Sequence, residues 1–170
     1  MDFKEIDNLV LVIGKTEGHI DQSIFARTIL DEKNGPPPEV NLFNEKNNGK
    51  SLLDLIEKGL VKSAHDISLG GLIVALSKMC IKGNKGIELN KPKNMINEIE
   101  YLFAEDQGRY LIEINPKNLK EVKKILTDNS IYHQELGVII DKEMIINKKT
   151  KVTIDELKSY NTNWLTDYMS

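Results

Sequence analysis

Short apolar runs place the strongest constraint on the fold of this chain. LVLVI at residues 9–13 is rich in branched side chains and stops at Gly14, which is typical of a buried strand. Similar strand-like runs occupy residues 60–67, 86–89, 109–114, 137–141 and 143–147. Segments of helical periodicity separate most of them. This order predicts an α+β protein in which helices cover a mixed sheet, and it disfavours a uniformly parallel Rossmann sheet.

Helices are expected between these runs. Residues 21–30 place apolar side chains three and four positions apart behind Asp21, a possible N-cap. The three prolines at 36–38 end that helix and form a stiff connector. Further helices are expected at residues 42–59, from Ser68 to about residue 82, at residues 96–103, and after Asn115-Pro116.

The C-terminal part of the chain carries three further signals. A tight polar turn joins the runs at 137–141 and 143–147, which predicts a β-hairpin. Thr153 and Glu156 have the spacing of a capping box, so a small helix or tail is expected to follow them. Trp164 and Tyr168 would either anchor this tail on the body or serve a neighbouring domain.

Composition limits the class of protein. The 170 residues, 40% of them apolar, are enough for one domain with one hydrophobic core. The 26 acidic and 23 basic residues are mixed along the chain, which gives no indication of a nucleic-acid partner. No apolar run has membrane-spanning length, and the first eight residues lack the character of a signal peptide. We expect no membrane contact, a reduced cytoplasmic setting, and Cys80, the single cysteine, as a core side chain.

The stretch SAHDISLGG at residues 63–71 is the first candidate site. A strand that leads through this stretch into a helix exposes unpaired backbone N–H groups, which attract anions. Gly70 and Gly71 would let a phosphate approach closely, with Ser68 beside it. Asp66, at the strand end, could hold a divalent cation that bridges the same phosphate.

A structural interpretation of the same stretch remains open. In that interpretation the two glycines only permit close packing of the helix, and Ser68 and Asp66 act as helix caps. His65 points to the strand face opposite Asp66 and would be a buried side chain with its hydrogen bonds satisfied.

The segment LFAEDQGRYLIEI at residues 102–114 is the second candidate site. It places Glu105, Asp106, Gln107 and Arg109 between a short apolar element and a strand. So many polar groups are expected there only if they face solvent or a ligand. The alternative is an exposed acidic turn with a surface arginine.

Together these motifs resemble the carboxyl-terminal domain of the phosphoribosylformylglycinamidine synthase family. The resemblance rests on SAHDISLGGLIVAL, LFAEDQGRYLIEI, IGKTEGHIDQSIFARTI, GPPPEVNLFNEKNNG and a terminal W-L-x-x-Y-M, and it covers residues 9–170. It implies a three-layer arrangement of helices around a mixed sheet, with residues 1–170 forming a single domain of a larger multidomain synthase. The usual loop of the family reads H-D-x-S-D-G-G. Leu69 replaces its second acid here, which weakens a metal or phosphate role for the loop.

The resemblance also implies an activity. Synthases of this family convert formylglycinamide ribonucleotide to formylglycinamidine ribonucleotide in de novo purine biosynthesis, with ATP, magnesium and ammonia from glutamine. By analogy with the other half of such an enzyme, Asp66 would be a magnesium ligand. The substrate- or nucleotide-binding residues, by the same analogy, would be Asp66, Ser68, Gly70, Gly71, Glu105, Asp106 and Gln107.

The resemblance places the chemistry itself in other domains. ATP and Mg²⁺ would be held mainly outside this chain, which carries no catalytic residue of the family, so the isolated domain is not expected to turn over. The implied partners are the remaining domains of the synthase, a glutaminase subunit and a small partner subunit. A domain of this kind should also expose an apolar face, either at the segments of Asp66 and Glu105 or at the edge of the first strand.

Two other functions remain open. One is a free-standing module that binds nucleotide or phosphate without chemistry. The other is a different member of the same superfamily, such as aminoimidazole ribonucleotide synthase, thiamine-monophosphate kinase or selenophosphate synthase. The EDQGRY segment and the proline-rich connector favour the synthase over these relatives.

Overall fold

The computed structural model describes residues 1–90 and 97–169, with residues 164–167 described by their backbone only. The strands are β1 Leu9–Ile13, β2 Val61–Ile67, β3 Gly86–Leu89, β4 Arg109–Ile114, β5 His133–Ile140, β6 Glu143–Ile146 and β7 Thr150–Thr153. The helices are α1 Ile24–Ile29, α2 Leu42–Glu57, α3 Gly71–Gly83, α4 Glu98–Phe103, α5 Leu119–Asp128 and α6 Ile154–Met169, with a short 3-10 turn η1 Pro116–Asn118 before α5.

The seven strands form one mixed sheet in the order β2-β4-β1-β5-β3-β6-β7. The pair β3 and β6 is parallel, and the other pairs are antiparallel. β1 lies near the middle, with Leu9 opposite Ile114 on β4 and opposite Val138 on β5. The predicted mixed sheet covered by helices is confirmed.

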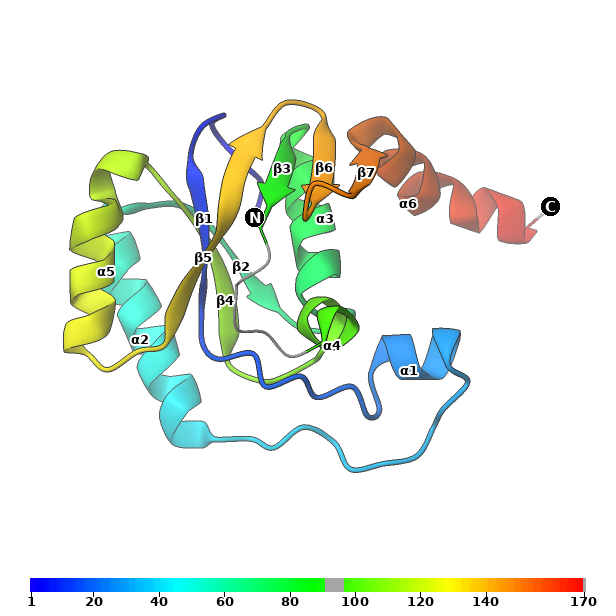
Figure 1. The fold of residues 1–170 in the computed structure, drawn as a ribbon, viewed down its shortest axis with the longest axis horizontal. Helices are drawn as coiled ribbons and strands as arrows, with labels where there is room; N and C mark the ends of the chain where they lie inside the picture. The colour runs from blue at the N-terminus through cyan, green and yellow to red at the C-terminus, as the bar shows by residue number, and fades with distance from the viewer. Residues whose placement is uncertain (91–96, 170) are drawn as a thin grey trace.

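Helices cover both faces of the sheet and make three layers (Figure 1). On one face, α2 and α5 pack with Leu11 and Ile13 of β1. On the other face, α3, α4 and α6 pack with Val10 and Val12 of the same strand. Because successive side chains of a strand point to opposite faces, β1 contributes to both cores, which explains its unbroken apolar sequence.

The first helix starts later than its sequence pattern predicts. α1 begins at Ile24, and the Ser23 hydroxyl accepts a hydrogen bond from the Ala26 N–H at 3.1 Å. Asp21 is therefore not the cap. Serine and aspartate are both strong caps, so the local pattern does not distinguish the two positions.

The predicted hairpin of residues 137–141 and 143–147 is wrong in its pairing. β5 and β6 do follow one another, but β3 lies between them, antiparallel to β5 and parallel to β6. Ile87 of β3 is opposite Ile139 on one side and Met144 on the other. Ladder hydrogen bonds are made by the backbone, so a turn sequence shows that two strands reverse direction and not that they are neighbours.

The C-terminal helix confirms its predicted start and corrects its predicted end. The Thr153 hydroxyl accepts from the Glu156 N–H at 3.2 Å, and Glu156 Oε2 accepts from the Thr153 N–H at 2.8 Å, which is a capping box. α6 then runs 16 residues and projects away from the body (Figure 1). Tyr168 is 81% exposed and does not anchor the helix on the body. The Trp164 side chain lies outside the described part of the chain.

Cys80 lies in α3 and is fully buried, as predicted. Burial raises the pKa of its thiol to about 12, so the thiol stays protonated at neutral pH. Within residues 1–90 and 97–169, every helix falls short of the length and apolar character that a membrane crossing requires.

Candidate functional site

The two candidate segments meet at one end of the sheet. Glu105 follows α4, and one of its carboxylate oxygens, Oε1, accepts hydrogen bonds from two backbone N–H groups at 2.8 Å each. One belongs to Gly70, just before α3, and the other to Ile24, the first residue of α1. Glu105 therefore ties together the starts of two helices that are far apart in the sequence.

The start of α3 differs from the prediction in one respect. The helix begins at Gly71, and Gly70 takes a left-handed conformation with a φ of 85° as its N-cap. Ser68 contributes its backbone carbonyl, which accepts from the Gly71 N–H at 3.0 Å, so its side chain is not the cap. The place where an external anion was expected is held by the Glu105 carboxylate.

Asp106 lies in a second cluster of backbone donors. Its two carboxylate oxygens accept from the N–H groups of Glu17, Gly18 and His19 at 3.0 to 3.2 Å. Successive N–H groups that converge in this way form a nest for an anion. The nest is part of the loop after β1, so Asp106 fixes that loop to the turn before β4.

Arg109 is buried beneath both clusters and is not the surface residue that the alternative interpretation expected. Its guanidinium donates to the carbonyls of Ala104 and Asp106 and to the Thr16 hydroxyl, at 2.6, 3.1 and 3.0 Å. Its Nη1 lies 3.8 Å from Oδ2 of Asp106. Burial lowers the pKa of Arg109, and the Asp106 carboxylate opposes that shift. The side chains of Glu105, Asp106 and Arg109 therefore form hydrogen bonds with groups of the protein itself.

Within the described residues, Asp66 is not among the hydrogen-bond partners of the Glu105, Asp106 or Arg109 side chains. His65 is buried in β2 and the carboxylate of Asp66 is largely exposed. The His65 Nδ1 lies 3.3 Å from Asp66 Oδ1, so the two side chains are not separated by the strand as the alternation predicted. Asp66 is paired in register with Tyr110, whose pKa is raised by burial and then by the charges of Glu45 and Asp66. Among the described residues no group of three or more histidine, cysteine, aspartate or glutamate side chains could hold a metal ion. The assignment of Asp66 as a magnesium ligand stays a prediction.

A polar cavity of about 870 Å³ lies beside the 105–107 turn. Of the predicted site residues, only Asp106 and Gln107 line it. The other lining residues come from the loop after β1, the start of α2 and the segment between α5 and β5, and include Lys15, His19, Asn41, Asn44, Asn47, Asn48 and Tyr132. The asparagines were missed. Asparagine is a poor helix former, so its recurrence in NLFNEKNN was an available signal of a side-chain role.

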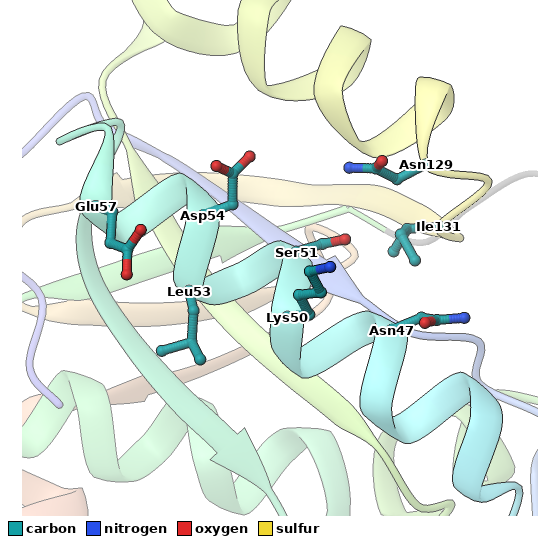
Figure 2. Close-up of a pocket in the computed structure, with 8 residues that line it drawn as sticks. All are labelled: Asn47, Lys50, Ser51, Leu53, Asp54, Glu57, Asn129 and Ile131. Carbon is teal, nitrogen blue, oxygen red and sulfur yellow. The ribbon is translucent and has the colours of Figure 1, made fainter.

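A second hollow adjoins the first, between α2 and the end of α5 (Figure 2). It measures about 540 Å³ and shares Asn47, Asn129 and Ile131 with the larger cavity. Lys50 and Asp54 of α2 also line it, and the end of α5 lies over it (Figure 2). None of the predicted site residues belongs to this hollow.

The role of Glu105 is testable through stability. Glu105→Ala removes the acceptor for two N–H groups, and we expect the free energy of unfolding to fall by about 1 to 3 kcal/mol. Urea unfolding of the two proteins measures this difference. Gln107→Ala is the matched control, since Gln107 is exposed and makes one long side-chain hydrogen bond. Equal stability of Glu105→Ala and Gln107→Ala would contradict this role of the carboxylate.

The fold and its loops match a known family. The profile described as "AIR synthase related protein, C-terminal domain" matches residues 5–148, which include all of the predicted site residues. The chain belongs to this family. The resemblance and the fold class predicted from the sequence are both confirmed.

Curated relatives of this family member are subunits of one enzyme. The chain is 63% identical over 169 residues to phosphoribosylformylglycinamidine synthase subunit PurL of Pelagibacter ubique (strain HTCC1062). It is 38% identical over 162 residues to the same subunit of Bartonella bacilliformis (strain ATCC 35685 / KC583 / Herrer 020/F12,63). These alignments cover 99% and 95% of this chain, but only 23% and 22% of the relatives. The chain thus spans less than a quarter of the length of the relatives it matches.

Solved structures show the same fold. Thermotoga maritima PurL in complex with FGAR superimposes on this chain with a TM-score of 0.74. The match covers 92% of this family member and 28% of that protein, at 20% identity. An identity this low supports a shared fold and carries no residue roles.

Proposed function

We propose that the chain acts as the C-terminal domain of a PurL-type phosphoribosylformylglycinamidine synthase in purine biosynthesis. The observation that carries this proposal is the 63% identity to a PurL subunit across 99% of the chain. In the proposed enzyme, formylglycinamide ribonucleotide is converted to formylglycinamidine ribonucleotide with ATP and with ammonia derived from glutamine. Residues 1–170 would be one domain of that longer polypeptide.

The proposed role of this domain is to shape a cleft, with the chemistry carried out elsewhere in the polypeptide. The carboxylates of Glu105 and Asp106 are engaged with backbone N–H groups, and Arg109 is engaged with carbonyls. In this proposal these groups hold the turn in place and take no part in proton transfer. The catalytic groups, ATP and magnesium would belong to other domains.

Solved structures of a relative support the wider setting of the proposal. Structures of Thermotoga maritima PurL have been solved with ATP and with ADP, and a structure of PurLQS from the same organism is also known. We propose that this chain belongs to a nucleotide-binding synthase of the same kind, and that it works beside a glutaminase subunit and a small partner subunit. The chain itself would not produce formylglycinamidine ribonucleotide when isolated.

A chimera tests the proposal. The segment of Pelagibacter ubique PurL that matches this chain is replaced by residues 1–170, and product formation from FGAR, ATP and ammonia is measured. We expect the chimera to be active, because the exchanged segments are 63% identical over 169 residues. The same PurL without the matching segment, and the isolated 170-residue chain, serve as the two controls and are expected to be inactive.

The outcome against the proposal is specific. A chimera that is soluble and folded but no more active than the truncated PurL would contradict it. Turnover by the isolated chain would contradict the assignment of the chemistry to other domains.

A free-standing binding module is the second candidate, and the 870 Å³ cavity favours it because cavities of this size hold small ligands. Under this function, ADP with magnesium should bind the isolated chain in a calorimetric titration. Lys15→Ala, at the cavity wall, should weaken binding, and Asp66→Ala, outside the cavity, should not. Absence of heat at millimolar ADP would rule this candidate out.

A further inference from the structure

The long connection between β1 and α2, together with the first two residues of α2, crosses one end of the sheet (Figure 1). We call this segment, residues 15–43, the strap; it includes α1. Its attachment to the body is mainly polar. Asp106 and Glu105 bind backbone N–H groups of the strap, and the Glu105 N–H donates to the His19 carbonyl at 3.1 Å. One apolar attachment is the ring contact of Phe25 with Phe103, whose centroids are 4.6 Å apart.

Several apolar side chains of the strap are exposed. Ala26 is the one residue of α1 that is buried, while Ile29 is 68% exposed. At the start of α2, Leu42 and Phe43 are each 74% exposed, and Val40 just before them is 56% exposed. Isolated exposed apolar residues such as Ile29 are ordinary, but Val40, Leu42 and Phe43 are exposed within four consecutive positions, which indicates a surface that normally has a partner.

The strap also borders the polar cavity. Phe43 and Pro38 belong to the cavity lining, whose other members include Asn44, Asn48 and Lys15. An apolar rim around a polar floor fits a cleft between two domains, because the rim can be covered while the polar floor receives the ligand.

The lengths of the relatives indicate what would cover the strap. In the PurL subunits that match this chain almost completely, more than three quarters of the polypeptide lies outside the match. That polypeptide is the one partner for which the observations argue.

We propose that the outward face of the strap docks onto the remaining polypeptide of a PurL-type subunit and that this contact closes the polar cavity. The inference rests on the proposed function and assigns to it a surface, with Leu42 and Phe43 at its centre. A second copy of the chain is the competing occupant, and the experiment separates the two.

Cysteine labelling in the PurL chimera tests the docking. Leu42→Cys is labelled with a maleimide in the isolated chain and in the full-length chimera, and modification at position 42 is followed by peptide mass spectrometry. Cys80 gives no background in the folded protein because it is buried. We expect labelling at position 42 to slow by roughly tenfold or more in the chimera, because interface cores exclude solvent. Leu53→Cys is the matched control, on the same helix and 60% exposed, and its rate should change by less than about twofold.

Three results would overturn the proposal. Position 42 could label equally fast in both proteins, or position 53 could be protected as strongly as position 42. The isolated chain could also sediment as a dimer with position 42 already protected, which would assign the strap to a second copy. If position 42 is protected in a folded but inactive chimera, the docking is supported and the proposed function is rejected. If the chimera is active but position 42 is not protected, the proposed function is supported and the docking is rejected.

Discussion

Replacing Arg109 with leucine is expected to lower the free energy of unfolding by about 3 to 5 kcal/mol, since it removes a buried charge that donates three hydrogen bonds and lies beside the Asp106 carboxylate. The guanidinium is 1% exposed and bonds the Ala104 and Asp106 carbonyls and the Thr16 hydroxyl. In the leucine variant those three acceptors lose their hydrogen-bond donor, and the Asp106 carboxylate loses the nearby positive charge. Domains of this size are stable by about 5 to 15 kcal/mol, so the variant should unfold at much lower urea.

Arg109→Lys is the matched control for charge. Lysine keeps the positive charge near Asp106, but a single ammonium lacks the planar fork that reaches several acceptors at once. Its stability should therefore fall between the wild type and Arg109→Leu in the same urea titration. A loss below about 1 kcal/mol for Arg109→Leu would show that the turn at 104–109 does not depend on the guanidinium.

Gly71→Ala is the second change with a large expected effect, about 3 kcal/mol or more of lost stability. Gly71 has a φ of 69°, and a Cβ there would lie 2.6 Å from the Ala104 carbonyl oxygen and 2.7 Å from the Phe103 carbonyl carbon. Both neighbours are backbone atoms at the end of α4, so relief requires that α3 and α4 move apart. Thermal and urea unfolding of the variant measure the cost.

Gly59→Ala separates the two causes. Gly59 has a nearly identical φ of 68°, but a Cβ there meets nothing within 4 Å. Gly59→Ala therefore introduces only the strain of the left-handed conformation, which should lower the free energy of unfolding by about 1 kcal/mol. If both variants lose the same stability, the close approach of α3 to α4 does not constrain Gly71.

Local patterns were sufficient for most of the secondary structure. β1, β2, β3 and β4 lie where apolar runs predicted strands, and α2 and α5 lie where helical spacing predicted helices. Periodicity and punctuation by glycine and proline act within a few residues, so they can be read without knowledge of the fold. The start of α6 was also readable, because a capping box is a contact between residues three positions apart.

The candidate site shows where such reading stops. Glu105 and Asp106 were singled out from the sequence, but their carboxylates accept from the N–H groups of Gly70, Ile24 and the loop at 17–19. Those partners are backbone groups, and backbone groups have no sequence signature. The sequence could therefore indicate polar residues in need of partners without telling whether a ligand or the protein itself supplies them.

The amino-acid sequence alone determined the fold class, the elements and the family, because hydrophobic periodicity, caps and motif order are properties of neighbouring residues. Only the tertiary structure decided that β3 separates β5 from β6, that Arg109 is buried, and that Glu105 occupies the start of α3. These facts depend on contacts between segments far apart in the chain. Such contacts form through backbone hydrogen bonds and close packing, which many different sequences can satisfy.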